Sequence, residues 1–218
     1  MMATKIDTEQ LIQSLTHDVR RVGPHAVRWR IALGILAGGI VTSALMATGL
    51  KIRPDLHTAT HGFPFWMKWF YTASLGIAAM AATARLARPT GRSLRILWVS
   101  AVPVLILVGI GIGELARTPA RDWLSMWLGG SWKVCPWLVL TLSLPIFIGL
   151  LWSFRKLAPT RLRAAGATAG LAAGAWAATI YCLHCPEVSA IFVLTWYSLG
   201  ILLAAGLGAL LGPRFMHW

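Results

Sequence analysis

Six long apolar runs dominate the pattern of hydrophobic and polar positions along the chain. Each run holds close to the ~20 residues that an α-helix needs to cross the hydrocarbon core of a bilayer. Because that core offers the backbone no hydrogen-bond partners, apolar runs of this length form helices. The pattern predicts an all-α polytopic membrane protein, a six-transmembrane-helix bundle with spans at about 29–50, 64–84, 95–114, 134–154, 164–182 and 188–211.

The segment before the first run has a different pattern. Residues 1–28 are mostly polar, yet apolar residues recur at three- and four-residue spacing, and Gly23-Pro24 follows them. Acidic residues near the start and basic residues near the end match the helix dipole, so we expect an amphipathic helix. It could lie on the membrane surface or bind a partner protein. Its apolar face consists of Leu11, Ile12, Leu15, Val19 and Val22.

The composition agrees with a membrane protein. Of the 218 residues, 57% are apolar and only 12% are charged, about half the ~25% charged fraction of soluble domains. The formal net charge of +13 is expected to reflect loops that face anionic membrane lipids rather than direct binding of nucleic acid. No signal-peptide cleavage pattern accompanies the first run, which is expected to remain as a span.

Basic residues lie mainly on one side of the predicted spans. Of the twenty Lys and Arg residues, fourteen fall in the N-terminal segment, the second and fourth connections and the C-terminus, whereas five fall in the opposite connections. Because positively charged loops stay in the cytoplasm, both termini are predicted to be cytoplasmic. The chain thus divides into a cytoplasmic segment, residues 1–28, and a transmembrane domain, residues 29–218.

Two further sequence patterns concern packing and the membrane interface. The third connection carries Trp123, Trp127 and Trp132, and indole rings prefer the membrane interface, so we expect a short helix at headgroup level. Small residues crowd the fifth and sixth runs. Because Gly and Ala let helices approach closely, these two spans are predicted to pack tightly.

Reactive side chains gather in one stretch between the fifth and sixth runs. Cys182, His184 and Cys185 lie there, and the predicted topology places Cys135, at the start of the fourth run, on the same outer side. Sulfur and imidazole ligands suit Cu(I) or Zn, and Cys-x-x-Cys is also the spacing of redox dithiols. A buried apolar role for Cys182 and a solvated loop position for His184 are the plainer alternatives.

Two other groups of residues on the outer side are expected to have structural roles. His57 and His61 lie in the first outer connection, where solvated loop positions are the expected role. Pro186 and Glu187 favour the first turn of a helix, because proline cannot continue a preceding helix and a carboxylate complements the helix dipole. The last span is therefore expected to begin near these residues.

Four segments carry a family resemblance: Ser131-Trp-Lys-Val-Cys135-Pro, Leu157-Ala-Pro-Thr-Arg161, Tyr181-Cys-Leu-His-Cys185-Pro-Glu187 and Trp196-Tyr-Ser-Leu-Gly200. With them the chain resembles the NrsF-type negative regulators of extracytoplasmic-function sigma factors. The resemblance covers nearly the whole chain and implies an integral inner-membrane anti-sigma factor, without enzymatic activity, that holds its sigma factor on the cytoplasmic side until a periplasmic signal arrives.

The resemblance also implies a periplasmic cysteine pair that senses metal or oxidative stress. The matching positions are Cys135 and Cys185, whereas Cys182 is an extra thiol; together with His184 these form the predicted sensing residues. Cys135, Cys185 and His184 are the candidate ligands for Cu(I) or Zn as the sensed ion, and no obligatory cofactor is expected.

A bridge between the outer ends of two spans suggests a mechanism. A disulfide requires Cα atoms within about 7 Å of each other, so it would restrict the relative movement of the two helices. The resulting shift of their cytoplasmic ends would alter how the sigma-binding segment is presented. The rival hypothesis is a membrane thiol-disulfide oxidoreductase that uses Cys182 and Cys185. The sequence contains no second redox pair for such a relay, and an oxidoreductase of this kind would not need a cytoplasmic amphipathic helix.

Overall fold

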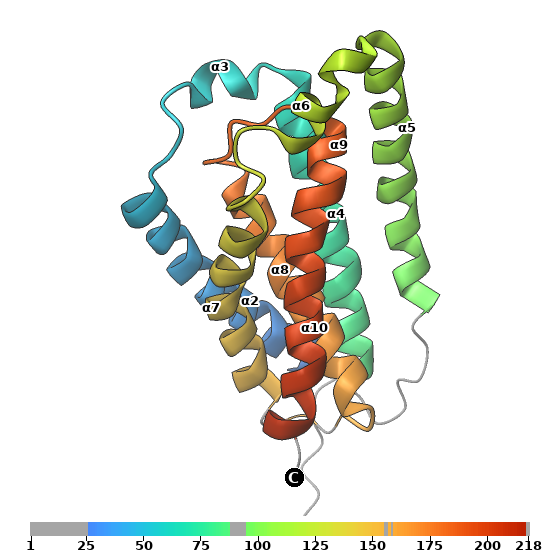
Figure 1. The fold of residues 1–218 in the computed structure, drawn as a ribbon. Coiled ribbons are helices and arrows are strands. Elements are labelled where there is room, and N and C mark those ends of the chain that lie inside the picture. Colours follow the sequence, from blue (N-terminus) through green and yellow to red (C-terminus); the bar gives the residue numbers. More distant parts are fainter. Residues whose placement is uncertain (1–25, 88–94, 155–156, 158, 217–218) are drawn as a thin grey trace, which may run out of the picture.

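A computed structural model describes residues 26–87, 95–154, 157 and 159–216 of the chain. These residues form a bundle of long helices with short helices at its upper end (Figure 1) and contain no strand. The all-α prediction is confirmed. The proposed N-terminal docking face, from Leu11 to Val22, lies outside the described residues.

Six long helical segments coincide with the six predicted runs. Three of them contain a tighter or wider turn, labelled η, that continues an α-helix. The segments are α2 (Ala26–Leu45) with η1 (Met46–Leu50); α4 (Phe63–Leu86); η2 (Arg95–Ser100) with α5 (Ala101–Arg117); α7 (Cys135–Phe154); α8 (Leu162–Tyr181); and α9 (Ala190–Phe192) with η4 (Val193–Tyr197) and α10 (Ser198–Phe215).

Four stretches of the described chain are long and apolar enough to cross a membrane: Val27–Leu50, Trp98–Arg117, Cys135–Phe154 and Ala190–Phe215. Helices α4 and α8 have comparable lengths, 24 and 20 residues, but are less apolar. Helix α4 carries a buried lysine, and α8 consists largely of Ala and Gly packed against α4, α7 and α10. Much of the surface of α4 and α8 is therefore covered by neighbouring helices.

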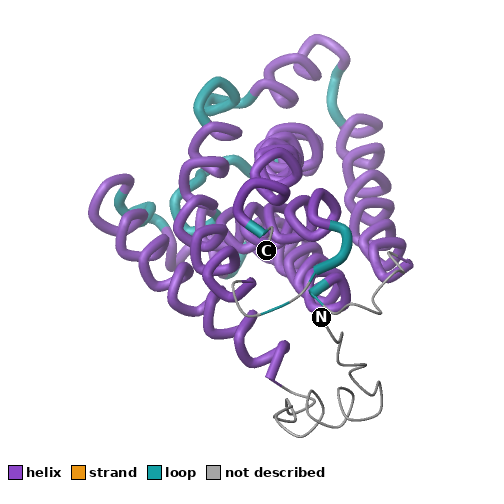
Figure 2. Tube along the Cα trace, turned by 90° about the horizontal axis from the view of Figure 1, so that it is seen from below, coloured by secondary structure: helices purple, strands orange, loops and turns teal. Residues whose placement is uncertain are grey.

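Close backbone contact joins α8 to α10. A Cβ atom added at Gly166 would collide with the carbonyl oxygen of Gly208, and one added at Gly208 would collide with that of Gly166. The predicted tight packing of the fifth and sixth runs is therefore confirmed. Seen from below, the helices of the bundle lie side by side (Figure 2).

Three short helices lie in the connections at the upper end in Figure 1. They are α3 (Leu56–Thr60), η3 (Ala120–Asp122) and α6 (Trp123–Leu128). The helix predicted in the tryptophan-rich connection is α6, which ends at Leu128 and is followed by Gly129, a residue with a positive φ of 57°. Trp127 and Trp132 pack on Trp196, with ring centroids 5.5 and 5.3 Å apart.

Candidate functional site

The three cysteines come together at the upper end of the bundle. Cys135 begins α7, Cys182 follows the last residue of α8, and Cys185 lies in the turn that leads to α9. All three are fully buried free thiols. Residues 182–187, here named the cysteine turn, therefore present their thiols to the protein interior rather than to solvent.

The end of α8 explains this inward direction. The amides of Cys182 and Cys185 donate to the carbonyl oxygens of Ala178 and Tyr181, at 3.0 and 3.1 Å, so the chain keeps a helical curl for one turn beyond the helix. Pro186 has no amide to continue the helix. The curl turns both thiols inward, with Cys185 near Cys135 of α7 and Cys182 near Lys68 and Thr72 of α4.

Two buried tyrosines lie beside the thiols. Tyr181 and Tyr197 pack with ring centroids 5.6 Å apart and are nearly inaccessible to solvent. The Tyr181 hydroxyl interacts with Cys135 and Cys185. The Tyr197 hydroxyl lies in the field of all three thiols but has no well-aligned hydrogen-bond partner among the described residues. The three thiols and the two phenol groups thus form one buried cluster.

Lys68 of α4 holds the cysteine turn from below. Its side chain is fully buried, and Nζ donates to the carbonyl oxygens of Cys185 and Glu187, at 3.0 and 2.5 Å. No carboxylate of the described chain forms an ion pair with it. Sequence reasoning missed this role, although the one lysine inside an apolar run was a signal, since a buried charge requires partners.

The connection between η1 and α3 holds the turn from the side. The Arg53 amide donates to the Leu183 carbonyl oxygen at 3.2 Å, and Arg53 Nη1 donates to that of Cys185 at 3.4 Å. The Arg53 guanidinium also pairs with Asp55, with N–O distances of 2.6 and 2.7 Å. This pairing lowers the pKa of the Asp55 carboxyl and raises the pKa of Arg53.

Glu187 joins the turn to the connection before α7. Its carboxylate accepts hydrogen bonds from the amides of Gly130 and Ser131, at 2.8 and 3.1 Å, and from Ser131 Oγ at 3.0 Å. The expectation that Glu187 opens the last helix is wrong, because α9 begins at Ala190. Glu114 from the end of α5 takes that role and accepts the Ala190 amide at 2.8 Å.

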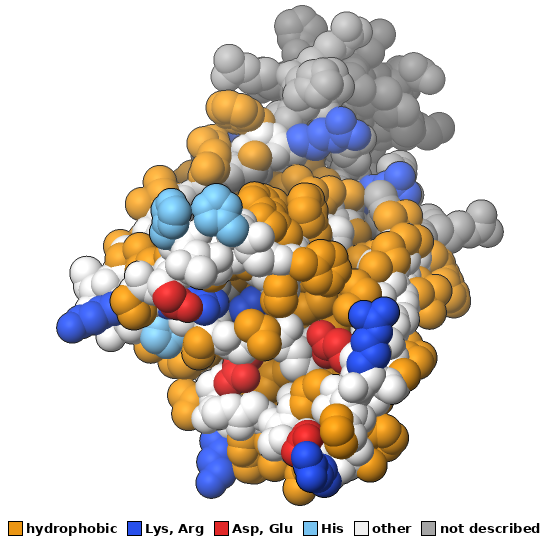
Figure 3. Space-filling model, turned by 90° about the horizontal axis from the view of Figure 1, so that it is seen from above, with side chains coloured by type: hydrophobic (Ala, Val, Ile, Leu, Met, Phe, Trp, Pro, Cys, Tyr) orange, Lys and Arg blue, Asp and Glu red, His pale blue; other side chains and the backbone are white. Residues whose placement is uncertain are grey.

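His184 occupies a separate position on the turn. Its Nδ1 lies 2.8 Å from the carbonyl oxygen of Lys51, and its ring packs 5.7 Å from that of Tyr181. Within the described chain, no three His, Cys, Asp or Glu side chains are grouped to hold a metal ion. The metal ligand set of Cys135, Cys185 and His184 stays a prediction from the sequence. On the upper face, charged groups of both signs lie among apolar side chains (Figure 3).

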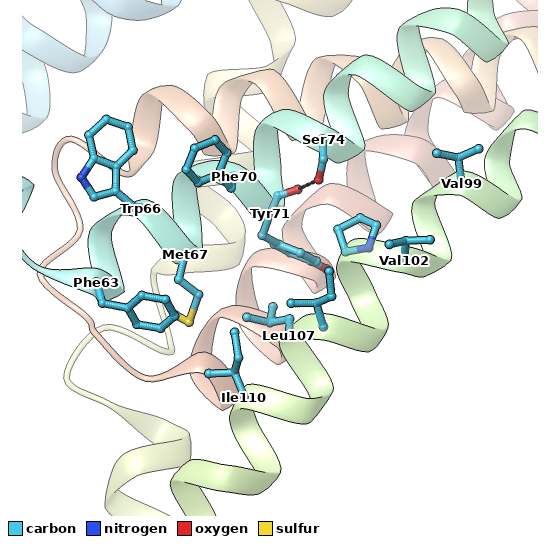
Figure 4. A pocket seen from close by; sticks show the side chains of 12 residues that line it. Phe63, Trp66, Met67, Phe70, Tyr71, Ser74, Val99, Val102, Leu107 and Ile110 are labelled. Atoms are coloured by element: carbon cyan, nitrogen blue, oxygen red, sulfur yellow. Dashed lines mark hydrogen bonds between the residues drawn. The ribbon is translucent and has the colours of Figure 1, made fainter.

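An apolar cleft of about 650 Å³ opens between α4 and α5, away from the thiols. Figure 4 shows its lining, in which Ser74 Oγ donates to the Tyr71 carbonyl oxygen at 2.8 Å. The Tyr71 hydroxyl is already paired with Ser198 Oγ, 2.6 Å away. The cleft offers apolar contact and no unpaired polar group that would select a ligand.

Comparison with known proteins identifies the relatives of the chain. The family described as negative regulator of sigma F, NrsF, matches residues 15–218. The chain is 39% identical to a probable anti-sigma-F factor NrsF of Azospira oryzae, over 97% of this chain and 99% of the relative. It is 37% identical to the anti-sigma-F factor NrsF of Caulobacter vibrioides, over 97% and 99%. No solved structure matches. The chain therefore belongs to the NrsF family of negative regulators of sigma F.

Proposed function

We propose that this protein is an anti-sigma factor of a bacterial inner membrane that sequesters an extracytoplasmic-function sigma factor. Both similar proteins are named as anti-sigma-F factors and align over almost their full length. The proposal includes six spans, with α4 and α8 crossing the membrane beside the four more apolar stretches. An even number of spans leaves both termini on one side, and the excess of Lys and Arg assigns that side to the cytoplasm.

In this topology the cysteine turn faces the periplasm. The periplasm is oxidising and receives metals and oxidants before the cytoplasm does. The observation that carries the sensing proposal is the shared burial of Cys135, at the start of α7, with Cys182 and Cys185, in the turn after α8. A chemical change there acts on the relative position of α7 and α8.

Oxidation is one such change. When Cys135 and Cys185 form a disulfide, each thiol loses its proton and the pair passes two electrons to the oxidant. The new bond fixes the start of α7 to the cysteine turn. A sensed metal ion, Cu(I) or Zn, would instead draw thiolates together and release their protons. Either event releases sigma in this proposal.

The output end is the N-terminal segment. We assign sigma binding to residues 1–28, through the apolar face formed by Leu11, Ile12, Leu15, Val19 and Val22. Amphipathic helices of this kind bind partner grooves through residues spaced by three and four. Helix α2 continues from this segment and packs on α7, which offers a short route from the thiols to the docking face.

A pull-down tests the docking assignment. The cognate sigma factor should co-purify with the full-length protein from detergent-solubilised membranes and be lost when the chain is truncated to begin at Arg28. A Leu15→Asp variant should also lose sigma, while Gln13→Ala, off the predicted apolar face, should retain it. Capture of sigma by the truncated protein would refute the assignment.

The thiol oxidoreductase alternative gains no support. The named relatives are regulators of a sigma factor, and the three cysteines of the sequence provide no second dithiol to pass electrons onward.

A further inference from the structure

Two exposed imidazoles lie beside each other on short helix α3. His57 is in this helix, and His61 directly follows it with helical backbone angles. Residues four apart on a helix lie on one face. The ring centroids are 5.1 Å apart, with ring planes inclined by 70°. Two histidines are visible side by side on the upper face (Figure 3).

The spacing of the rings fits a single metal ion. When each ring directs one nitrogen to the same ion, with a Zn–N bond of about 2.05 Å, the metal lies about 3.2 Å from each ring centroid. Centroids 5.1 Å apart then subtend about 106° at the metal, near the ~109° of tetrahedral zinc. A tetragonal ion such as Cu²⁺ requires about 90° between neighbouring ligands, which exposed side chains reach by a small rotation.

The surroundings leave this pair free to bind. The nearest carboxylate in the sequence, Asp55, is occupied by Arg53, and the pairing also offsets the charge of Arg53 that would repel a cation. His184 is directed to the carbonyl oxygen of Lys51. A metal at the pair would therefore have two imidazole ligands and complete its coordination with water.

We propose that His57 and His61 form a binding site for one divalent transition-metal ion of the imidazole-preferring class, Cu²⁺ or Zn²⁺, separate from the buried thiols. The site does not rest on the anti-sigma function. It would order α3, because a five-residue helix is marginal by itself. Through Arg53, the same connection contacts Leu183 and Cys185 of the cysteine turn.

Electron paramagnetic resonance with Cu²⁺ tests the site. The full-length protein is purified in detergent with a tag that contains no histidine and given less than one equivalent of Cu²⁺. The wild type should show two imidazole nitrogens on one copper. His57→Ala and His61→Ala should each lose this signature and bind Cu²⁺ at least about tenfold more weakly, since even indirect support of a ligand is worth that much.

His217→Ala is the matched control, because it removes a histidine far along the sequence from the pair and should leave the signal unchanged. His57 and His61 are exposed, so elution of their variants in size exclusion should match the wild type. Unchanged copper binding in both His57→Ala and His61→Ala would overturn the proposal. Loss of the signature in His217→Ala would also overturn it, since the site would then be a different one.

Discussion

At the scale of single residues, the buried ammonium group of Lys68 is the contact that joins the cysteine turn to α4. It supplies donors to two carbonyl oxygens that no other described group serves at such short distance. A buried cation without a carboxylate partner is costly. Its persistence here is explained by the two carbonyl oxygens that it serves, of which that of Cys185 also accepts a longer hydrogen bond from Arg53.

Replacing Lys68 by methionine should loosen the turn. Methionine has similar length but donates to neither carbonyl oxygen. The Cys185 oxygen keeps its longer bond from Arg53, whereas the Glu187 oxygen loses its donor, and a buried unsatisfied group costs about 1–3 kcal/mol. We expect a lower midpoint of thermal unfolding in detergent and faster alkylation of Cys185. Lys133→Met, at an exposed position of the same end, should change neither. Equal alkylation rates in the two variants would show that Lys68 does not position the turn.

The residue scale is also where prediction from sequence reached its limit. The clustering of Cys135 with Cys182 and Cys185 on one side followed from counting spans. The contacts that Lys68, Arg53 and Glu187 make to the turn join residues far apart in the chain, and no local pattern encodes them. Pro186 and Glu187 misled for the same reason, because Glu114 from another helix caps α9.

At the scale of elements, hydropathy was a sound guide. An apolar run of about 20 residues forms a helix in a bilayer, because its backbone finds no other hydrogen-bond partners there. All six runs are helical in the structure. The sequence was a weaker guide to which helices lie at the centre of the bundle. The Ala and Gly pattern of α8 indicated close packing, and α8 indeed contacts α4, α7 and α10.

A glycine pair on α10 tests this packing with an internal control. Gly208→Val should force α8 and α10 apart, because its Cβ would meet the backbone of Gly166, whereas Gly206→Val points into open space. Both changes alter helix propensity equally. We expect the first to destabilise the bundle by about 1–3 kcal/mol or more, measured as a lower midpoint of thermal unfolding. Equal midpoints would contradict the described helix contact.

At the scale of the whole molecule, the cysteine turn is a junction of distant segments. Arg53, Lys68 and the Gly130–Ser131 amides reach it from three parts of the chain. A local change among the thiols therefore alters contacts with several helices together. Such a change is the starting point of the proposed release of sigma.

The most direct test of this account measures sigma retention across a stress pulse. Cells expressing wild type, Cys135→Ser or Cys185→Ser are exposed to a thiol oxidant or to Zn²⁺, and sigma is quantified on the membrane protein before and after. The account predicts that the wild type holds sigma before the pulse and releases it afterwards, whereas both variants hold sigma throughout. Release from the serine variants to the wild-type extent would contradict sensing by these cysteines.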